Sequence, residues 1–365
     1  MFEINGFLSK ISEVKASDVH LTLGKQPSLR ISGEIVKLDI PALTEDDFDG
    51  IISTVLYRDI QYKIKDTTDL DFTYELKGVS RYRVNYCKDL GMPKLTMRLI
   101  PYEIPTFKDL MLPPSIQSFT EFNNGILLIT GATGSGKSTT IASMIENINK
   151  EQKRHIITIE DPVEFLYSDK NCLITQRGLG IDVPDFPSGI KYALRQDPDI
   201  IVIGEIRDKE TVEAAISAAE TGHFVLSTIH TNSATQTINR IVGLFDNDRK
   251  EFIRKRFAVA LKGTIAQKLI PRVNGGLIPA LEIMASTPAI SDYIAKDKMN
   301  DIEQLISHAN SPTLCTMNSS IYNLYKMNFI EKEIALEYSD NPTELYQMIR
   351  GIYHGLQDPS GGNLI

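Results

Sequence analysis

The segment GATGSGKST at residues 131–139 has the spacing of a phosphate-binding loop, GxxxxGK followed by Ser or Thr. It follows the apolar run GILLIT (125–130) and opens the helical pattern TTIASMIENINK, so it joins a strand to a helix. Glycines let backbone N–H groups surround phosphate oxygens, and the helix N-terminus adds partial positive charge. We predict that Lys137 bridges the β- and γ-phosphates and that Ser138 ligates Mg²⁺. The predicted nucleotide-binding residues are Thr133, Gly134, Ser135, Gly136, Lys137, Ser138 and Thr139.

Acidic residues follow two other apolar runs. HIITI (155–159) leads into EDPVE, and DIIVIG (199–204) leads into Glu205. Many nucleotide-hydrolysing proteins carry an Asp at the position of Gly204, one residue before Glu205. Because ligands of parallel sheets bind beyond the carboxyl ends of the strands, these acids are expected to converge on the phosphate loop. One would orient or deprotonate water and another would help to hold the metal through water. The acids are Glu160, Asp161, Glu164 and Glu205, and a helix cap or solvated turn is the alternative role for each one taken singly.

The segment HFVLSTIH (223–230) carries a histidine at each end. At about 3.3 Å per residue, the two are roughly 20 Å apart in a straight strand, so both cannot contact one phosphate. His230 lies at the carboxyl end and is predicted to sense the γ-phosphate. His223 is predicted to be a structural or interface residue.

Arginines gather in the N-terminal part of the chain. Arg81 and Arg83 share one face of a predicted strand, and Arg98 lies in the next strand. Taken on their residues alone, they form a solvated polar face. The alternative is that they reach a phosphate-loop site and stabilise transferred charge.

Two kinds of pattern divide the chain. Strand-like alternation after a helical start predicts an α+β domain with an antiparallel sheet at residues 1–100. The segment 101–114, rich in proline, is predicted to be a semi-rigid linker. Apolar runs alternating with helical patterns then predict a parallel sheet covered on both faces at 115–357, mostly helical from about residue 250. Residues 358–365 are predicted to be disordered.

The composition weighs against several classes of protein. A net charge of -8 and a pI near 5.4 weigh against a nucleic-acid partner. The three widely separated cysteines, Cys87, Cys172 and Cys315, leave no CxxC zinc pair and predict no disulfide framework. No stretch approaches the ~18 apolar residues of a membrane span, so we expect docking at a membrane to require partners.

Five motifs, taken in order, resemble those of the secretion and pilus ATPases, and among these the type IV pilus retraction ATPases. The motifs are ASDVHLTLGKQPSLRISGEI (16–35), GATGSGKSTT (131–140), TIEDPVEF (158–165), RQDPDIIVIGEIRD (195–208) and TGHFVLSTIHTNSATQTINRI (221–241). The resemblance covers nearly the whole chain. It implies an α/β protein in which a PAS-like N-terminal domain precedes a RecA-like ATPase domain.

The resemblance also implies an activity and an assembly. It implies a homohexameric ring that hydrolyses ATP with Mg²⁺, each nucleotide lying between the two domains and completed by a neighbouring subunit. Glu164 is implied as the catalytic carboxylate and Glu205 as the metal-side partner, and Arg81, Arg83 and Arg98 become phosphate-facing. The ring would drive pilus retraction and twitching motility. It would sit in the cytoplasm at the inner face of the cytoplasmic membrane, against a platform protein of the pilus.

Two departures from the family bear on the mechanical work. PAISDYIAKDK (288–298) stands where retraction motors carry an AIRNLIRE-like segment, and it lacks those arginines. Three scattered cysteines exclude the four-cysteine zinc module of extension and type II secretion ATPases, which favours retraction. The alternatives are an accessory or an extension or secretion ATPase of the same superfamily, a phosphotransferase and, least favoured by charge, a DNA translocase.

Overall fold

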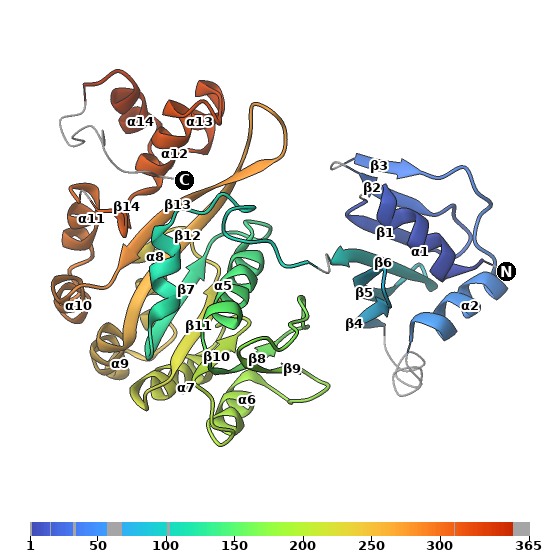
Figure 1. Cartoon of the computed structure of the whole chain (residues 1–365), viewed down its shortest axis with the longest axis horizontal. Helices are drawn as coiled ribbons and strands as arrows, with labels where there is room; N and C mark the ends of the chain where they lie inside the picture. The colour runs from blue at the N-terminus through green and yellow to red at the C-terminus, as the bar shows by residue number, and fades with distance from the viewer. Residues whose placement is uncertain are drawn as a thin grey trace. The chain divides into compact units, whose positions relative to one another are not determined.

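The computed structural model describes residues 2–14, 16–31, 34–56, 68–100, 103–309 and 311–352 (Figure 1). The chain divides into two compact units. The first comprises Met1–Glu103 with Pro162–Leu166, and the second comprises Ile104–Asp161 with Tyr167–Ile365. The predicted disordered segment 358–365 lies outside the described residues. The predicted domain limits stay a prediction.

The first unit is an antiparallel sheet with two helices, as its alternating pattern predicts. Its elements are α1 (Ile4–Glu13), β1 (Asp18–Thr22), β2 (Ser28–Ile31), β3 (Glu34–Lys37), α2 (Glu45–Val55), β4 (Asp69–Leu76), β5 (Ser80–Asp89) and β6 (Met92–Ile100). The strand order is β3-β2-β1-β6-β5-β4. Phe72 and Tyr74 of β4 are buried on one face, together with Tyr82, Val84 and their neighbours, because side chains two apart in a strand share a face.

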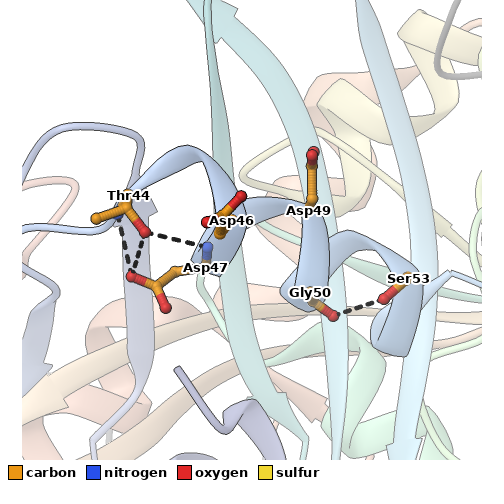
Figure 2. Close-up of a pocket in the computed structure, with 6 residues that line it drawn as sticks. All are labelled: Thr44, Asp46, Asp47, Asp49, Gly50 and Ser53. Atoms are coloured by element: carbon orange, nitrogen blue, oxygen red, sulfur yellow. Dashed lines mark hydrogen bonds between the residues drawn. The ribbon is translucent and has the colours of Figure 1, made fainter. Parts of the chain in front are cut away.

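Helix α2 begins with a capping box. The Thr44 hydroxyl accepts a hydrogen bond from the Asp47 N–H at 3.2 Å, and the Asp47 carboxylate accepts one from the Thr44 N–H at 3.2 Å (Figure 2). Hydrogen bonds donated to the Asp47 carboxylate by the Thr44 hydroxyl, and then by the Thr44 and Phe2 N–H groups, lower the pKa of Asp47. The pocket at this helix start is lined by Thr44, Asp46, Asp47, Asp49, Gly50 and Ser53. Three carboxylates would repel a phosphate, so the pocket does not suit a nucleotide.

The second unit contains the remaining elements. They are α4 (Ser115–Ser118), the 3-10 helix Phe119–Glu121, β7 (Gly125–Thr130), α5 (Lys137–Glu151), β8 (His155–Glu160), β9 (Leu173–Gly178), α6 (Phe186–Ala193), β10 (Ile200–Ile203), α7 (Lys209–Glu220), β11 (Phe224–Ile229), α8 (Ala234–Gly243), α9 (Asn247–Ala260), β12 (Leu261–Pro271), β13 (Leu277–Ala285), α10 (Pro288–Ala295), α11 (Met299–Ser307), β14 (Leu314–Cys315), α12 (Met317–Lys326), α13 (Lys332–Tyr338) and α14 (Pro342–Ile349). The strand order is β14-β13-β12-β7-β11-β10-β8-β9. Strands β12 to β9 of that order are mutually parallel.

Helices cover both faces of this sheet, which explains why its strands are apolar throughout. Leu127 and Ile129 of β7 pack against Ile141, Ile145 and other residues of α5. Ile126 and Leu128 point to the opposite face, where they join residues of helices α6 to α11 in a second cluster. The predicted mixed α/β class is confirmed.

The prediction of a mostly helical chain from about residue 250 was wrong for residues 261–285. Strands β12 and β13 there form an antiparallel hairpin that extends the sheet, joined through the Gly275–Gly276 turn. The strands are buried because β12 also pairs in parallel with β7. Strand β12 mixes polar and apolar residues without a strict two-residue alternation, so its pattern alone does not identify a strand.

Candidate active site

The predicted phosphate loop connects β7 to α5. Gly136 is the N-cap of α5 and has a φ of 87°, a left-handed conformation that favours glycine. A Cβ atom there would also lie 2.8 Å from the amide nitrogen of Gln267, so a larger residue would be strained and would have to shift that side chain. The loop therefore keeps the open backbone that phosphate binding requires.

Lys137 lies inside this loop. Its side chain is buried, and its ammonium group donates hydrogen bonds to the carbonyl oxygens of Gly131 at 2.9 Å and Ala132 at 2.8 Å. The Ser135 hydroxyl is also buried and has no hydrogen-bond partner within the described ranges. A buried ammonium group and an unpaired hydroxyl beside a helix N-terminus fit a phosphate group. Ser138, the predicted Mg²⁺ ligand, is exposed on the first turn of α5.

The order of the parallel strands sets how far each polar residue lies from this loop. Strand β11 adjoins β7, β10 adjoins β11, and β8 adjoins β10. At about 4.8 Å per strand, the ends of β11, β10 and β8 lie roughly 5, 10 and 14 Å from the end of β7. His230, Glu205 and Glu160 therefore follow one another along the carboxyl edge that bears the phosphate loop.

Glu205 and His230 are brought together at this edge. The Glu205 side chain is only 14% exposed, and its Oε2 lies 3.5 Å from the His230 Nε2. Arg207 pairs with the other oxygen of Glu205, and this hydrogen bond raises the pKa of the guanidinium group. Glu160 accepts hydrogen bonds from the Thr158 hydroxyl at 2.7 Å and from Gln176 at 3.2 Å. His223 lies before β11, where it contacts the Ala218 carbonyl oxygen.

Gly204 stands where an Asp is common, and its surroundings explain the difference. Its N–H donates to the Ile159 carbonyl oxygen at 2.8 Å. A Cβ atom on Gly204 would meet that oxygen at 3.3 Å and the Glu160 Cα at 3.4 Å. Strands β10 and β8 approach closely here, so a side chain at position 204 would be tight against the backbone of β8.

We expect Gly204→Asp to lower the free energy of unfolding by about 1–3 kcal/mol, because the new side chain must displace backbone atoms of β8. Urea denaturation measures this change. Gly243→Ala is the control, because a Cβ atom at this last residue of α8 meets open space. A Gly204→Asp protein as stable as the wild type would contradict the close-approach explanation.

The arginines and Glu164 belong to the first unit. The Arg83 Nη1 lies 3.5 Å from the Glu164 Oε1, and both side chains are about one-third exposed. Arg98, directly opposite Arg83 in the sheet, donates to Asp18 at 2.9 Å. Arg81 is buried and donates to the Thr73 hydroxyl at 3.2 Å. A uniformly solvated arginine face therefore does not describe these three residues, and Arg83 is paired with Glu164, a predicted catalytic acid.

One residue that the sequence did not reveal contacts the phosphate loop. Gln267 of β12 is buried, and its Oε1 accepts a hydrogen bond from the Thr140 hydroxyl at 2.8 Å. Its amide nitrogen faces Gly136. The bond joins residues 127 positions apart, so no local motif could have indicated it. Only the pairing of β12 with β7 places Gln267 beside the loop.

Comparison with known proteins assigns the family. The family described as "Type II/IV secretion system protein" matches residues 83–320. The "Type IV pilus retractation ATPase PilT" of Pseudomonas aeruginosa is 35% identical over 340 residues, covering 93% of this chain and 99% of that protein. This chain belongs to the type II/IV secretion family.

Two further comparisons also extend over nearly the whole chain. The "Type IV pilus ATPase PilU" of Pseudomonas aeruginosa is 32% identical over 349 residues, covering 95% of this chain and 91% of that protein. The crystal structure of the pilus retraction motor PilT with bound ADP superposes with a TM-score of 0.89 at 40% identity, covering 95% of this chain and all of that one. No helix in the described part of this family member is long and apolar enough to cross a membrane.

Proposed function

We propose that this protein is an ATPase motor that hydrolyses ATP to drive type IV pilus retraction. The observation that carries the proposal is the placement of three side chains along one edge of the sheet. Lys137 lies inside the phosphate loop, and His230, paired with Glu205, follows along the same edge. The full-length similarity to a pilus retraction motor solved with ADP supports the nucleotide and the mechanical work.

Each group has a proposed role. Lys137 and the loop N–H groups bind the phosphates, with contacts from Thr133, Gly134, Ser135, Gly136 and Thr139, and Ser138 binds Mg²⁺. Mg²⁺ takes few protein ligands beside phosphate and water, which suits an exposed hydroxyl. Glu205 supports the metal through water, with Glu160 further along the edge. Glu164 acts as the base toward the attacking water.

His230 and the arginines complete the proposed site. His230, held against Glu205, senses the γ-phosphate. Arg81, Arg83 and Arg98 stabilise charge on the transferred phosphoryl group. We propose that the protein assembles as a homohexamer in the cytoplasm, at the inner face of the cytoplasmic membrane, with a pilus platform protein as its partner. Nucleotide turnover would then switch the arrangement of the two units.

A second candidate is an accessory ATPase of the same machine. It is favoured by the arginine-free segment 288–298, which contains the whole of helix α10. Phosphate release by the purified protein with Mg²⁺ and ATP separates these proposals. A motor turns over ATP alone, an accessory ring binds ATP with little turnover, and a phosphotransferase accelerates sharply only when an acceptor is added.

We expect Arg83→Ala to lower kcat roughly tenfold, less than the 10²–10³-fold loss typical of a lone transition-state donor, because Arg81 and Arg98 share the charge. Stability should barely change, since the ion pair with Glu164 is about one-third exposed at both ends. Lys25→Ala is the matched control, because it removes an exposed pair with Asp89 in the same unit. An Arg83→Ala protein with wild-type kcat would assign Arg83 to the solvated surface.

A further inference from the structure

Glu282 joins the N-termini of two helices. It lies on β13, and its Oε1 accepts a hydrogen bond at 2.8 Å from the N–H of Ala234, the first residue of α8. The N–H of Met317, the first residue of α12, also lies close enough to this carboxylate to lower its pKa. Both helices have ten residues, and their N-terminal partial charges favour a carboxylate between them.

Helix α8 in turn holds the loop that carries His230. The hydroxyl groups of Thr231 and Thr237 are 2.6 Å apart, and the Asn232 N–H donates to Gln236 at 3.3 Å. These bonds join both loop residues that directly follow His230 to the first two turns of α8. A displacement of the α8 N-terminus would therefore move His230 relative to Glu205.

Helix α12 belongs to a different part of the second unit. With α13 and α14 it packs on Ile278 and Ala280 of β13, in a hydrophobic cluster separate from the one that contains α8 (Figure 1). Glu282 therefore accepts a hydrogen bond from the first residue of α8 and also lies beside the N–H of the first residue of α12.

The surroundings of Glu282 are costly for a charge. Desolvation raises its pKa to about 7, and the nearby Asp340 and Glu303 also raise it, while the two backbone donors lower it. Glu303 itself accepts a hydrogen bond from the Thr235 hydroxyl of α8 at 2.8 Å. A partly buried, desolvated position beside other acids would favour an uncharged residue unless the two helix N-termini need an acceptor.

We propose that Glu282 is a positioning residue for ATP hydrolysis. Glu282 fixes the N-terminus of α8 relative to α12, and α8 in turn fixes the position of His230. This inference rests on the proposed ATPase function. Glu282 touches neither nucleotide nor metal in this account and acts only through His230. The C-terminal helices α12 to α14 thereby gain a mechanical connection to the catalytic edge.

A double-mutant cycle on the full-length protein tests this connection. We expect Glu282→Gln to lower kcat about tenfold while KM for ATP stays within twofold, because a displaced catalytic group costs turnover more than binding. In a His230→Ala background the same substitution should change kcat by less than about twofold, because no imidazole remains to be positioned. Glu146→Gln is the control, because it removes a buried carboxylate on α5 that is paired with Lys170. The effect of Glu146→Gln on kcat should be the same in the wild-type and His230→Ala backgrounds.

The outcomes separate the inference from the function. Wild-type protein without ATP turnover would overturn the proposed function, and this inference with it. Normal wild-type turnover with additive effects of Glu282→Gln and His230→Ala would overturn the inference alone. If Glu282→Gln does not fold, Glu282→Asp retains the charge but withdraws it from the two N–H groups, and the same criterion of non-additivity applies.

Discussion

Lys137→Ala should reduce ATP hydrolysis to background and weaken nucleotide binding. The substitution removes the only ammonium group that the described chain places inside the phosphate loop, where it contacts the Gly131 and Ala132 carbonyl oxygens. A buried donor aimed at developing phosphate charge typically contributes about 10²–10³-fold to kcat, and ground-state phosphate contacts are lost as well. Phosphate release and binding of a fluorescent ATP analogue measure the two effects.

Lys150→Ala provides the matched control for Lys137→Ala. It lies on the same helix, but its side chain is 43% exposed and pairs with Glu146. We expect its turnover to stay within about twofold of the wild type, because exposed ion pairs contribute little. Hydrolysis that survives Lys137→Ala would place the nucleotide outside this loop.

Glu164→Gln should abolish hydrolysis and leave ATP binding intact. The amide cannot accept the proton of the attacking water, and general-base catalysis contributes about 10²–10⁴-fold. Binding should persist because the phosphate contacts come from the loop. The readouts are single-turnover hydrolysis and ATP affinity, with Glu210→Gln, an exposed acid at the start of α7, as the control.

Glu205→Gln distinguishes the two candidate bases. If Glu205 supports the metal, its substitution should raise the Mg²⁺ concentration needed for half-maximal turnover, whereas Glu164→Gln should not. Wild-type turnover in Glu164→Gln would reject Glu164 as the base. The pairing of Glu205 with His230 would then make Glu205 the leading candidate.

Local patterns predicted much of the sheet and one side of the site. The motif predicted the loop at 131–139, and periodicity predicted the buried strand before it. Periodicity also predicted the buried strands that precede Glu160, Glu205 and His230, and the parallel arrangement places all these strand ends at one edge. These features depend on neighbours in the sequence or on the general geometry of parallel sheets. They are the part of a fold that a single sequence specifies most directly.

The parts that could not be predicted depend on contacts between distant residues. The β12–β13 hairpin was taken for helix because β12 mixes polar and apolar residues without a strict two-residue alternation. Arg83 and Glu164 are 81 residues apart, so their pairing is decided by tertiary structure rather than by either motif. Glu282 and Ala234 are 48 residues apart, and although Ala234 lies in the motif at 221–241, Glu282 belongs to none of the five motifs.

The central claim is that this chain drives pilus retraction. The most direct measurement compares surface pilus density and twitching in a strain deleted for this gene, complemented with the wild-type gene or with the Lys137→Ala variant. We predict more surface pili and lost movement after deletion, restored only by the wild-type gene. Loss of pili would contradict the claim and indicate extension. Unchanged pili and movement would contradict it as well, and would favour an accessory role or another secretion machine.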